Sequence, residues 1–361
     1  MINKLLQKNS LLYQQTRSKI EGGIASGLYR KGDRLPSERT LSEQFGVSMI
    51  TMRRALEEMA DDGILEKQWG RGVYVKKSLA PIIVPKKIAL TVLHDRKNLA
   101  HPAVSDFIYG LGEAIENSRN ISLEIVFITK AMLENSDYSI LSDKSIDGLI
   151  VTILEITPED ISRIKTHIPD IVGVNRPDLS PSVIFDYEAA TVKMMDYLYN
   201  MGHRQIALIG GVEGTLTSKA IVGAYKKNLN DRNIPFDKSL VRSGSYERDS
   251  GYDLAKKILR RKDITAIIAG DDNIAVGVMD AVSEAGLNCP EDISVCSFND
   301  FPVASMTKPA LTTVAVPFRK MGRIAGQTLL ESMNGKISAG EIKLEGELII
   351  RGSVCKSKEQ K

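Results

Sequence analysis

LPSERTLSEQFGVSMITMRRAL, residues 35–56, is the stretch that decides the fold of the first part of the chain. Pro36 and Ser37 favour the start of a helix, because proline fits the first turn and a serine oxygen accepts an otherwise unpaired backbone N–H there. The pattern predicts that this helix ends at Gly46 and that Ser48 caps a second helix with one polar, basic side and one apolar side. Two short helices joined by a glycine turn predict a helix-turn-helix, whose second helix suits the major groove of DNA.

The residues that follow predict a two-stranded wing. Asp62-Gly63 closes the second helix, and residues 64–67 and 73–76 alternate as short strands around Trp69-Gly70-Arg71-Gly72. An arginine between two glycines can approach a phosphate or the minor groove, because neither neighbour carries a side chain. The alternative is an ordinary small helical subdomain with a solvated charged face.

Charge is distributed unevenly along the chain. Residues 1–78 carry 14 lysines and arginines against 9 aspartates and glutamates, whereas the remaining residues carry 34 against 36. The basic excess therefore lies on the helix-turn-helix and wing, which indicates a polyanionic partner for that part alone.

The amino-acid composition limits the classes to which the protein can belong. The chain has 361 residues, of which 43% are hydrophobic and 26% charged, so it can form two or more domains with cores. No apolar run reaches the roughly 20 residues that span a bilayer, so we expect no membrane association. The three cysteines, Cys289, Cys296 and Cys355, have no pairing or metal-ligand spacing. We therefore expect a cytoplasmic protein without a metal site or cofactor.

Four segments are expected. Residues 1–78 should form the DNA-binding domain, beginning with an amphipathic helix that ends at Gly27, and residues 79–86 a short linker containing two prolines. From residue 87 to 353, short apolar runs alternate with longer amphipathic segments, which predicts an α/β domain of parallel sheets in two lobes with a cleft between them. Residues 354–361 should form a polar tail.

Ligands of open α/β sheets bind beyond the carboxyl ends of the strands. The loops to consider are therefore those after Leu93, Ile209, Ala269 and Phe298. They contain His94, a glycine-rich run at 210–214, Asp271-Asp272 and Asn299-Asp300.

The first part of the chain resembles the winged helix-turn-helix of GntR-type transcription regulators. The resemblance is carried by Leu35-Pro36-Ser37-Glu38-Arg39, Phe45-Gly46-Val47-Ser48, Thr51, Arg53, Ala55-Leu56 and Gly70-Arg71-Gly72. The family usually has arginine after the Val-Ser of the turn, and here Met49 and Ile50 stand there instead. This departure matters for the operator, because a major-groove guanine contact normally uses the bidentate fork of an arginine.

The resemblance and the residue types together give a set of candidate DNA-binding residues. They are Arg39, Ser48, Met49, Ile50, Thr51, Arg53, Gly70 and Arg71.

The second part resembles the effector domain of LacI/GalR-type repressors, which is similar to periplasmic sugar-binding proteins. The motifs that carry this resemblance are residues 146–150, 182–183, 202–207, 290–295, 311–314 and 348–353, with Asp186, Asp272, Ala275 and Gly277. The family topology implies one lobe over about 87–183 plus 317–341, and the other over about 184–316 plus 342–353.

The resemblance also implies an effector site. The arginine that grips sugar in the family aligns with Ala220, beside Lys219, and the family's aspartate aligns with Asn299. An aromatic position that can stack on a sugar ring aligns with Tyr246. Together with the strand-end residues, the candidate effector-binding residues are His94, Lys219, Tyr246, Asp271 and Asn299.

An enzyme is the alternative class, in which a sugar- or nucleotide-processing α/β domain carries an accessory DNA-binding module. Residues 210–219 lack the Gly-Lys-Ser/Thr of a phosphate loop, and no GxSxG or HExxH motif occurs. Asp271-Asp272 would be the acid/base pair, although Asp272 is equally explained as a helix cap. A third alternative, a nucleoid-type DNA protein without an effector, does not explain the presence of a two-lobed α/β domain.

The combination resembles arabinose-responsive repressors. We therefore expect a homodimeric repressor without catalytic residues that binds palindromic double-stranded operator DNA and responds to a sugar, with a pentose as the leading candidate. Ligand would close the lobes and change the spacing of the two recognition helices.

Overall fold

The structure is a computed structural model that describes the chain except residues 1, 79–85, 95–100, 117, 119, 144, 154, 337–339 and 359–361. It contains two compact units, Met1–Pro85 and Lys86–Lys361. Apart from Lys86, the expected linker lies outside the described residues. No helix of the described part is long and apolar enough to cross a membrane.

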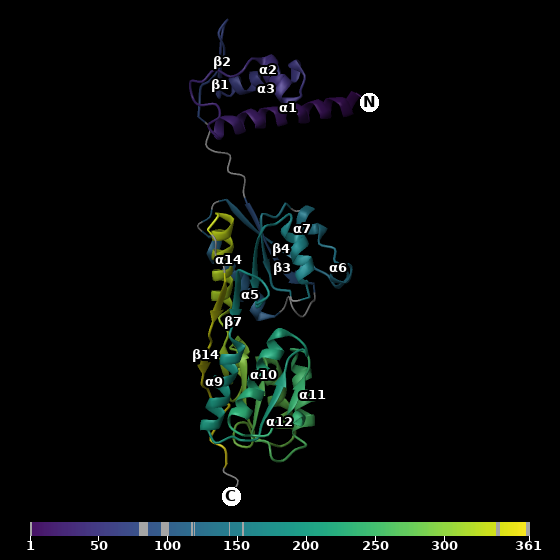
Figure 1. Ribbon diagram of the computed structural model, residues 1–361, viewed down its shortest axis with the longest axis vertical. Helices are drawn as coiled ribbons and strands as arrows, with labels where there is room; N and C mark the ends of the chain where they lie inside the picture. Colours follow the sequence, from purple (N-terminus) through teal and green to yellow (C-terminus); the bar gives the residue numbers. More distant parts are fainter. Residues whose placement is uncertain are drawn as a thin grey trace. The chain divides into compact units, whose positions relative to one another are not determined.

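The first unit is a winged helix-turn-helix (Figure 1). Its elements are α1 (Ile2–Ala25), α2 (Glu38–Phe45), α3 (Met49–Asp61), β1 (Leu65–Gln68) and β2 (Gly72–Val75). Gly46 ends α2 in the left-handed conformation with a φ of 64°, and Asp62 caps α3, so the predicted helix ends are confirmed. The predicted wing strands, residues 64–67 and 73–76, were wrong by one residue at each of their four ends, because Leu65 pairs with Val75 and Gln68 with Gly72.

A small core holds this unit together. It consists of the buried side chains of Ile20, Ile24, Leu35, Leu41, Met52, Leu56, Met59, Ile64, Leu65 and Val75. Backbone bonds from Leu35 to Val73 and from Val75 to Asp33 also tie β2 to the segment before α2. The wing is thereby fixed to the body of the unit.

The second unit contains two six-stranded sheets. Lobe one has the order β13-β7-β6-β5-β3-β4, and lobe two has the order β14-β12-β11-β10-β8-β9. The strands of lobe one are β3 (Lys86–Leu93), β4 (Ile121–Ile128), β5 (Gly148–Val151), β6 (Asp170–Val174), β7 (Ser182–Phe185) and β13 (Glu341–Leu344). Those of lobe two are β8 (Ile206–Gly210), β9 (Val241–Ser243), β10 (Ala266–Ala269), β11 (Ser294–Asn299), β12 (Thr312–Ala315) and β14 (Glu347–Ile349). All pairs are parallel except β12 with β14.

Helices cover the two sheets (Figure 1). Lobe one carries α5 (Pro102–Ile115), α6 (Lys130–Asn135), α7 (Ser139–Asp143), α8 (Pro158–Lys165) and α14 (Phe318–Met333). Lobe two carries α9 (Tyr187–Asn200), α10 (Leu216–Asp231), the 3-10 turn η1 (Lys238–Leu240), α11 (Arg248–Ile258), α12 (Asp272–Glu284) and α13 (Pro302–Met306). Glycines let helix pairs approach closely: a methyl at Gly110 of α5 would meet the backbone of α14, and one at Gly277 of α12 the backbone of α11.

The chain passes between the lobes after β7, after β12 and between β13 and β14. The lobe boundaries implied by the family topology were wrong at two of these places. Ile184 and Phe185 pair with Lys343 and Leu344 in the sheet of lobe one, so the crossings lie two or three residues later. Of the expected tail, residues 354–358 are described, and the Ser357 N–H donates to the Met201 carbonyl in lobe two.

Candidate DNA-binding surface and effector cleft

Local capping sets the start of the recognition helix α3. The Ser48 side chain accepts from the Thr51 N–H at 3.2 Å, and the two hydroxyls lie 2.9 Å apart. Ser48 and Thr51 therefore stabilise the first turn of the helix, where base-reading side chains would stand.

Several side chains that the sequence singled out are exposed around this turn, and Thr51 is partly exposed. Ile50 is 81% exposed, whereas Met49 is 39% exposed because its sulfur turns back to accept from the Ser42 hydroxyl of α2. Arg53 pairs with Glu38 at 3.1 Å and Arg39 with Glu43 at 3.1 Å. Exposed pairs of this kind contribute only about 0–1 kcal/mol, so either guanidinium can exchange its carboxylate for a base or phosphate.

The wing presents its tip to solvent. Gly70 has a φ of 72° and Gly72 a φ of 115°, which glycine adopts without strain. Arg71 between them is exposed, and its N–H donates to the Gln68 carbonyl at 2.9 Å. The first unit thus places Gly70 and Arg71 on a fixed hairpin.

A polar cluster joins the two lobes. Asp271 has a fully buried side chain that accepts from the Asn273 N–H at 2.6 Å and from Asn299 Nδ2 at 2.8 Å. From lobe one, His101 Nε2 reaches the same carboxylate at 3.3 Å. The His101 ring also lies edge-on to Tyr246, with centroids 6.5 Å apart, so the carboxyl ends of the lobe-two strands face the start of α5.

The backbone at the end of β11 is unusual. Asn299 has a φ of 108° and the following Asp300 a φ of 58°, in a region that residues other than glycine seldom adopt. Strained backbone conformations of this kind persist only where the surrounding structure keeps them in place, and they are concentrated at binding sites. Here it directs the Asn299 amide to Asp271.

Tyr187 connects the polar cluster to a cavity. Burial raises its pKa above the usual value, the charge of Asp271 acts in the same direction, and Thr217 bonds to its hydroxyl. Tyr187 also lines a cavity of about 390 Å³ together with Lys219 and Asn175. Lys219 therefore lines this cavity, whereas Tyr246, Asp271 and Asn299 belong to the polar cluster and are not among the residues that line it.

His94 lies apart from the polar cluster and the cavity in the described contacts. Its ring is exposed and packs edge-on against Phe127 of β4, with centroids 5.8 Å apart. Sequence reasoning missed His101, Tyr187 and Phe301, whose ring lies 4.9 Å from that of His101. The only available signal for His101 was its place in a loop after a strand, because its partner is 170 positions away.

The interpretation of Asp272 as a helix cap was wrong. The residue that caps α12 is Asp271, whereas Asp272 accepts from Ser297 at 2.5 Å, Thr313 at 3.0 Å and the Phe301 N–H at 2.6 Å. Burial raises the pKa of Asp272 to about 7. Its oxygens bond within lobe two, so Asp272 fastens β11, β12 and the loop before α13 to each other.

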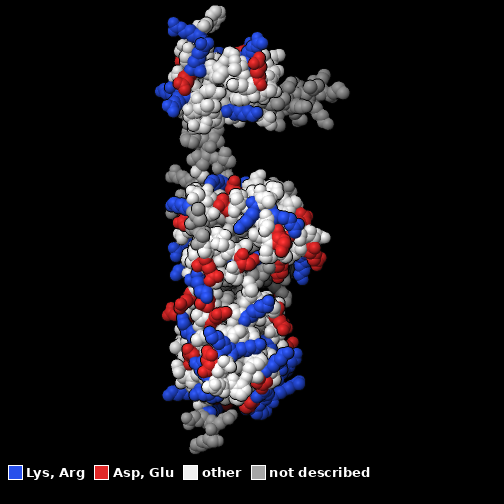
Figure 2. All heavy atoms as spheres, in the orientation of Figure 1, with Lys and Arg blue, Asp and Glu red and all other residues white. Residues whose placement is uncertain are grey.

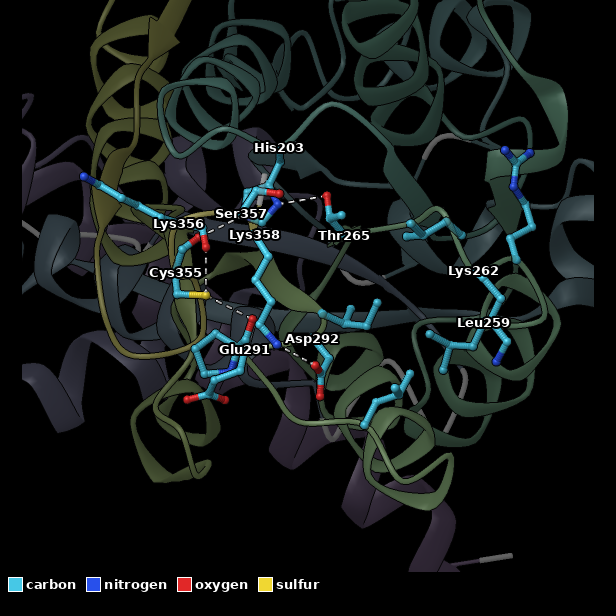
Figure 3. A pocket seen from close by; sticks show the side chains of 15 residues that line it. His203, Leu259, Lys262, Thr265, Glu291, Asp292, Cys355, Lys356, Ser357 and Lys358 are labelled. Carbon is cyan, nitrogen blue, oxygen red and sulfur yellow. Dashed lines mark hydrogen bonds and ion pairs between the residues drawn. The ribbon is translucent and has the colours of Figure 1, made fainter. Parts of the chain in front are cut away.

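A second cavity, of about 260 Å³, lies at the opposite ends of the lobe-two strands (Figure 3). His203 is buried there and neutral, because burial lowers its pKa. Its Nε2 donates to the Cys355 carbonyl at 3.0 Å, and its Nδ1 accepts from the Thr265 hydroxyl. With the 3.0 Å pair of Lys358 and Asp292, these bonds fasten the end of the chain to lobe two.

Comparison with known proteins agrees with both halves of the structure. Residues 12–75 match the bacterial regulatory proteins of the gntR family, and residues 195–354 match the periplasmic binding protein-like domain. Over 328 residues the chain is 27% identical to the HTH-type transcriptional repressor PurR of Pectobacterium carotovorum, covering 88% of this chain and 96% of that protein. It is 28% identical over 243 residues to catabolite control protein A of Priestia megaterium, covering 64% and 73%.

A solved structure agrees as well. The transcriptional repressor AscG of Escherichia coli has a TM-score of 0.66 at 26% identity, over 75% of this chain and 99% of that one. The chain is therefore a DNA-binding transcriptional regulator. More specifically, it joins a GntR-type helix-turn-helix domain to a periplasmic-binding-protein-like domain similar to that of LacI/GalR regulators, which confirms the two resemblances.

Proposed function

We propose that this regulator is a homodimeric repressor whose affinity for a palindromic operator is set by a small polyhydroxyl ligand in the cleft between the lobes. The observation that carries the proposal is the cluster of His101, Tyr246, Asp271 and Asn299 at the carboxyl ends of the lobe-two strands. A carboxylate accepts from sugar hydroxyls, an amide both donates and accepts, and a tyrosine ring packs on the apolar face of a sugar.

The ligand class is a sugar, and a pentose is the first candidate. The cavity of about 390 Å³ beside Tyr187, a residue that interacts electrostatically with Tyr246 and Asp271 of the cluster, falls at the lower end of the range of small-molecule sites, roughly 300–1,000 Å³. Lys219 lines the cavity, but its charge is one position away from Ala220, where the family has an arginine. A neutral sugar therefore suits the site better than one whose binding depends on a bidentate arginine.

The position of His101 suggests how ligand changes DNA binding. His101 belongs to lobe one and Asp271 to lobe two, so a ligand that bonds to Asp271 alters the contact between the lobes. In a dimer, a change in lobe angle shifts the two recognition helices relative to each other. A coupling of roughly 1–3 kcal/mol corresponds to about a 5–150-fold change in operator affinity.

Residues 1–78 would supply the DNA contacts, through Arg39, Arg53 and the first turn of α3, and the wing would add phosphate contacts. The segment 87–353 would supply the effector site and the dimer contact. Support for the latter comes from exposed apolar side chains such as Tyr109 and Met306, which a second copy would cover. Sedimentation of the full chain should show a dimer, and a monomer at micromolar concentration would contradict this part of the proposal.

A thermal-shift screen of the full chain against pentoses, hexoses, polyols and sugar phosphates tests the ligand class. Binding to the folded state raises its stability by about 2.7 kcal/mol at a concentration of 100 Kd. We expect a neutral sugar to raise the melting temperature of the second unit. The enzyme alternative predicts that the same compound is converted, so the mixture should also be analysed for product.

A further inference from the structure

Cys289 and Cys355 lie on neighbouring segments of lobe two, although they are far apart in the sequence. The Cys289 thiol donates to the Ser353 carbonyl, with a sulfur–oxygen distance of 3.6 Å. The Cys355 thiol donates to the Pro290 carbonyl at 3.2 Å. Each sulfur therefore touches the segment that carries the other cysteine, which no spacing in the sequence indicated.

Bonds to β11 hold the backbone around both thiols. The Val295 N–H donates to the Ser353 carbonyl at 2.8 Å, and the Cys355 N–H donates to the Ser294 hydroxyl at 3.2 Å. The same Val295 N–H also acts on the Cys289 sulfur. Because one residue of β11 contacts the surroundings of both cysteines, the two thiols are placed where a disulfide between them needs little movement of the chain.

The two thiols differ in their access to solvent. Both residues are half-buried, but only Cys355 lines the cavity of about 260 Å³ at this end of lobe two (Figure 3). Burial raises the pKa of the Cys289 thiol to about 12, and the nearby charges of Glu291 and Cys355 act in the same direction. An oxidant that enters the cavity therefore meets Cys355 first, and Cys289 is the thiol that can react afterwards.

We propose that Cys355 and Cys289 are a peroxide-sensitive pair that closes to a disulfide and fastens the C-terminal segment to lobe two. The Cys355 thiolate attacks one oxygen of hydrogen peroxide: the S–O bond forms, the O–O bond breaks, and the other oxygen leaves as hydroxide and takes up the proton that Cys355 lost. The Cys289 sulfur then attacks the Cys355 sulfur, so the S–S bond forms, the S–O bond breaks and the Cys289 proton leaves with the hydroxide as water. Together, two thiols and one peroxide give one disulfide and two waters.

Cys296 is the internal control for this reaction. It is fully buried, its thiol lies 3.9 Å from the Ile267 carbonyl, and burial raises its pKa. It is not among the residues that line the cavity. We therefore expect Cys296 to stay reduced while the other two cysteines are oxidised.

Basic side chains around the cavity favour reversal of the disulfide by an anionic thiol. Lys262 and Lys356 line the cavity and are exposed, and Lys and Arg side chains gather over α11, whose end leads into the cavity wall (Figure 2). Positive charge attracts glutathione, which carries net negative charge. Exchange with this thiol would return Cys355 and Cys289 to their reduced forms.

The test uses the full chain, reduced, freed of reductant and then exposed to a few equivalents of hydrogen peroxide. The remaining thiols are alkylated with N-ethylmaleimide in denaturant and counted by intact mass. We expect all three cysteines to be alkylated before oxidation and only Cys296 after it, with a peptide map that joins Cys289 to Cys355. Since a disulfide removes conformational freedom from the unfolded chain, the melting temperature of the second unit should rise by several degrees, and glutathione should reverse both changes.

Serine variants assign the roles of the three thiols. Cys296→Ser should form the disulfide as the wild type does. In Cys289→Ser the sulfenic acid of Cys355 has no partner, so dimedone should trap it. Cys355→Ser should keep both remaining thiols reduced at the same dose of peroxide. Equal melting temperatures of the reduced proteins will show that the fold is intact.

Several outcomes would overturn the inference. They are three free thiols after peroxide treatment, further oxidation of Cys355 while Cys289 stays free, and a disulfide that joins two chains instead of closing within one. A mapped disulfide that leaves the melting temperature unchanged would overturn the fastening of the C-terminal segment. These measurements use neither DNA nor sugar, so their failure leaves the proposed function standing.

Discussion

Gly211→Ala is the sharpest perturbation of the effector cleft, because it moves an aromatic ring without removing any polar group. A methyl added at Gly211 would lie 2.5 Å from the Tyr246 hydroxyl oxygen and closer still to the ring. Since non-bonded heavy atoms prefer roughly 3.5–4.0 Å, the ring must move by about 1 Å or more. Tyr246 would then lose its position relative to Thr215 and Asp271, which both act on its hydroxyl.

The expected loss can be estimated from the contacts that Tyr246 offers to a ligand. An aromatic contact contributes about 0.5–1.5 kcal/mol, and a hydrogen bond a similar amount. Together they give a loss of roughly 1–3 kcal/mol, or about 5–150-fold in affinity for the sugar that the thermal-shift screen returns. Operator affinity without ligand should not change, because the first unit is untouched.

Gly223→Ala is the matched control. It adds the same methyl in α10, where no other atom lies within 4 Å, and alanine favours the interior of a helix by up to about 1 kcal/mol. We expect wild-type ligand affinity and equal or higher stability in this variant. Isothermal titration of both variants decides the matter, and full ligand affinity in a folded Gly211→Ala would refute the placement of Tyr246 in the site.

Three further predictions concern the operator and the fold. Arg39→Ala and Arg53→Ala should each cost about 1–3 kcal/mol of operator binding and relax preference at one symmetric pair of base positions, measured by competition with variant duplexes. Met49→Arg should shift the selected site toward guanine; the same selected site for both proteins would mean that residue 49 does not face the bases. Asp272 should make folding less favourable as pH rises from about 4 to about 7, because its pKa is raised from 3.8 to about 7 and the folded state keeps a proton that the unfolded chain has lost. That contribution amounts to roughly 4 kcal/mol, so urea unfolding of Asp272→Asn should depend less on pH over this range, and an unchanged dependence would show that Asp272 is ionised in the fold.

Local chemistry explains which parts of the fold the sequence could predict. The ends of α2 and α3 depend on Ser37, Gly46 and Ser48, which act within one helical turn, so they were predictable. The register of the wing depends on pairing with the segment before α2 as well as between its own strands. No local pattern contains that information, and the predicted strand ends shifted by a residue.

The polar cluster in the cleft was also only partly predictable from local sequence patterns. Asp271 and Asp272 are neighbours of one residue type, and their roles differ because Asp271 is in an extended conformation with a φ of −163° while Asp272 begins the helix. Sequence alone gave no means of separating them. His101 was missed because its contact with Asp271 exists only once the two lobes have folded against each other.

The central claim is that operator binding by the first unit is coupled to ligand binding in the cleft of the second. The most direct measurement is the affinity of the full chain for its selected operator, by fluorescence anisotropy of labelled duplex, across a titration of the sugar identified by thermal shift. We predict a change of about 5–150-fold in the wild type and a response displaced to higher sugar concentration in Gly211→Ala, with equal affinities in the absence of sugar. An operator affinity that stays constant while the sugar saturates the cleft would contradict the coupling.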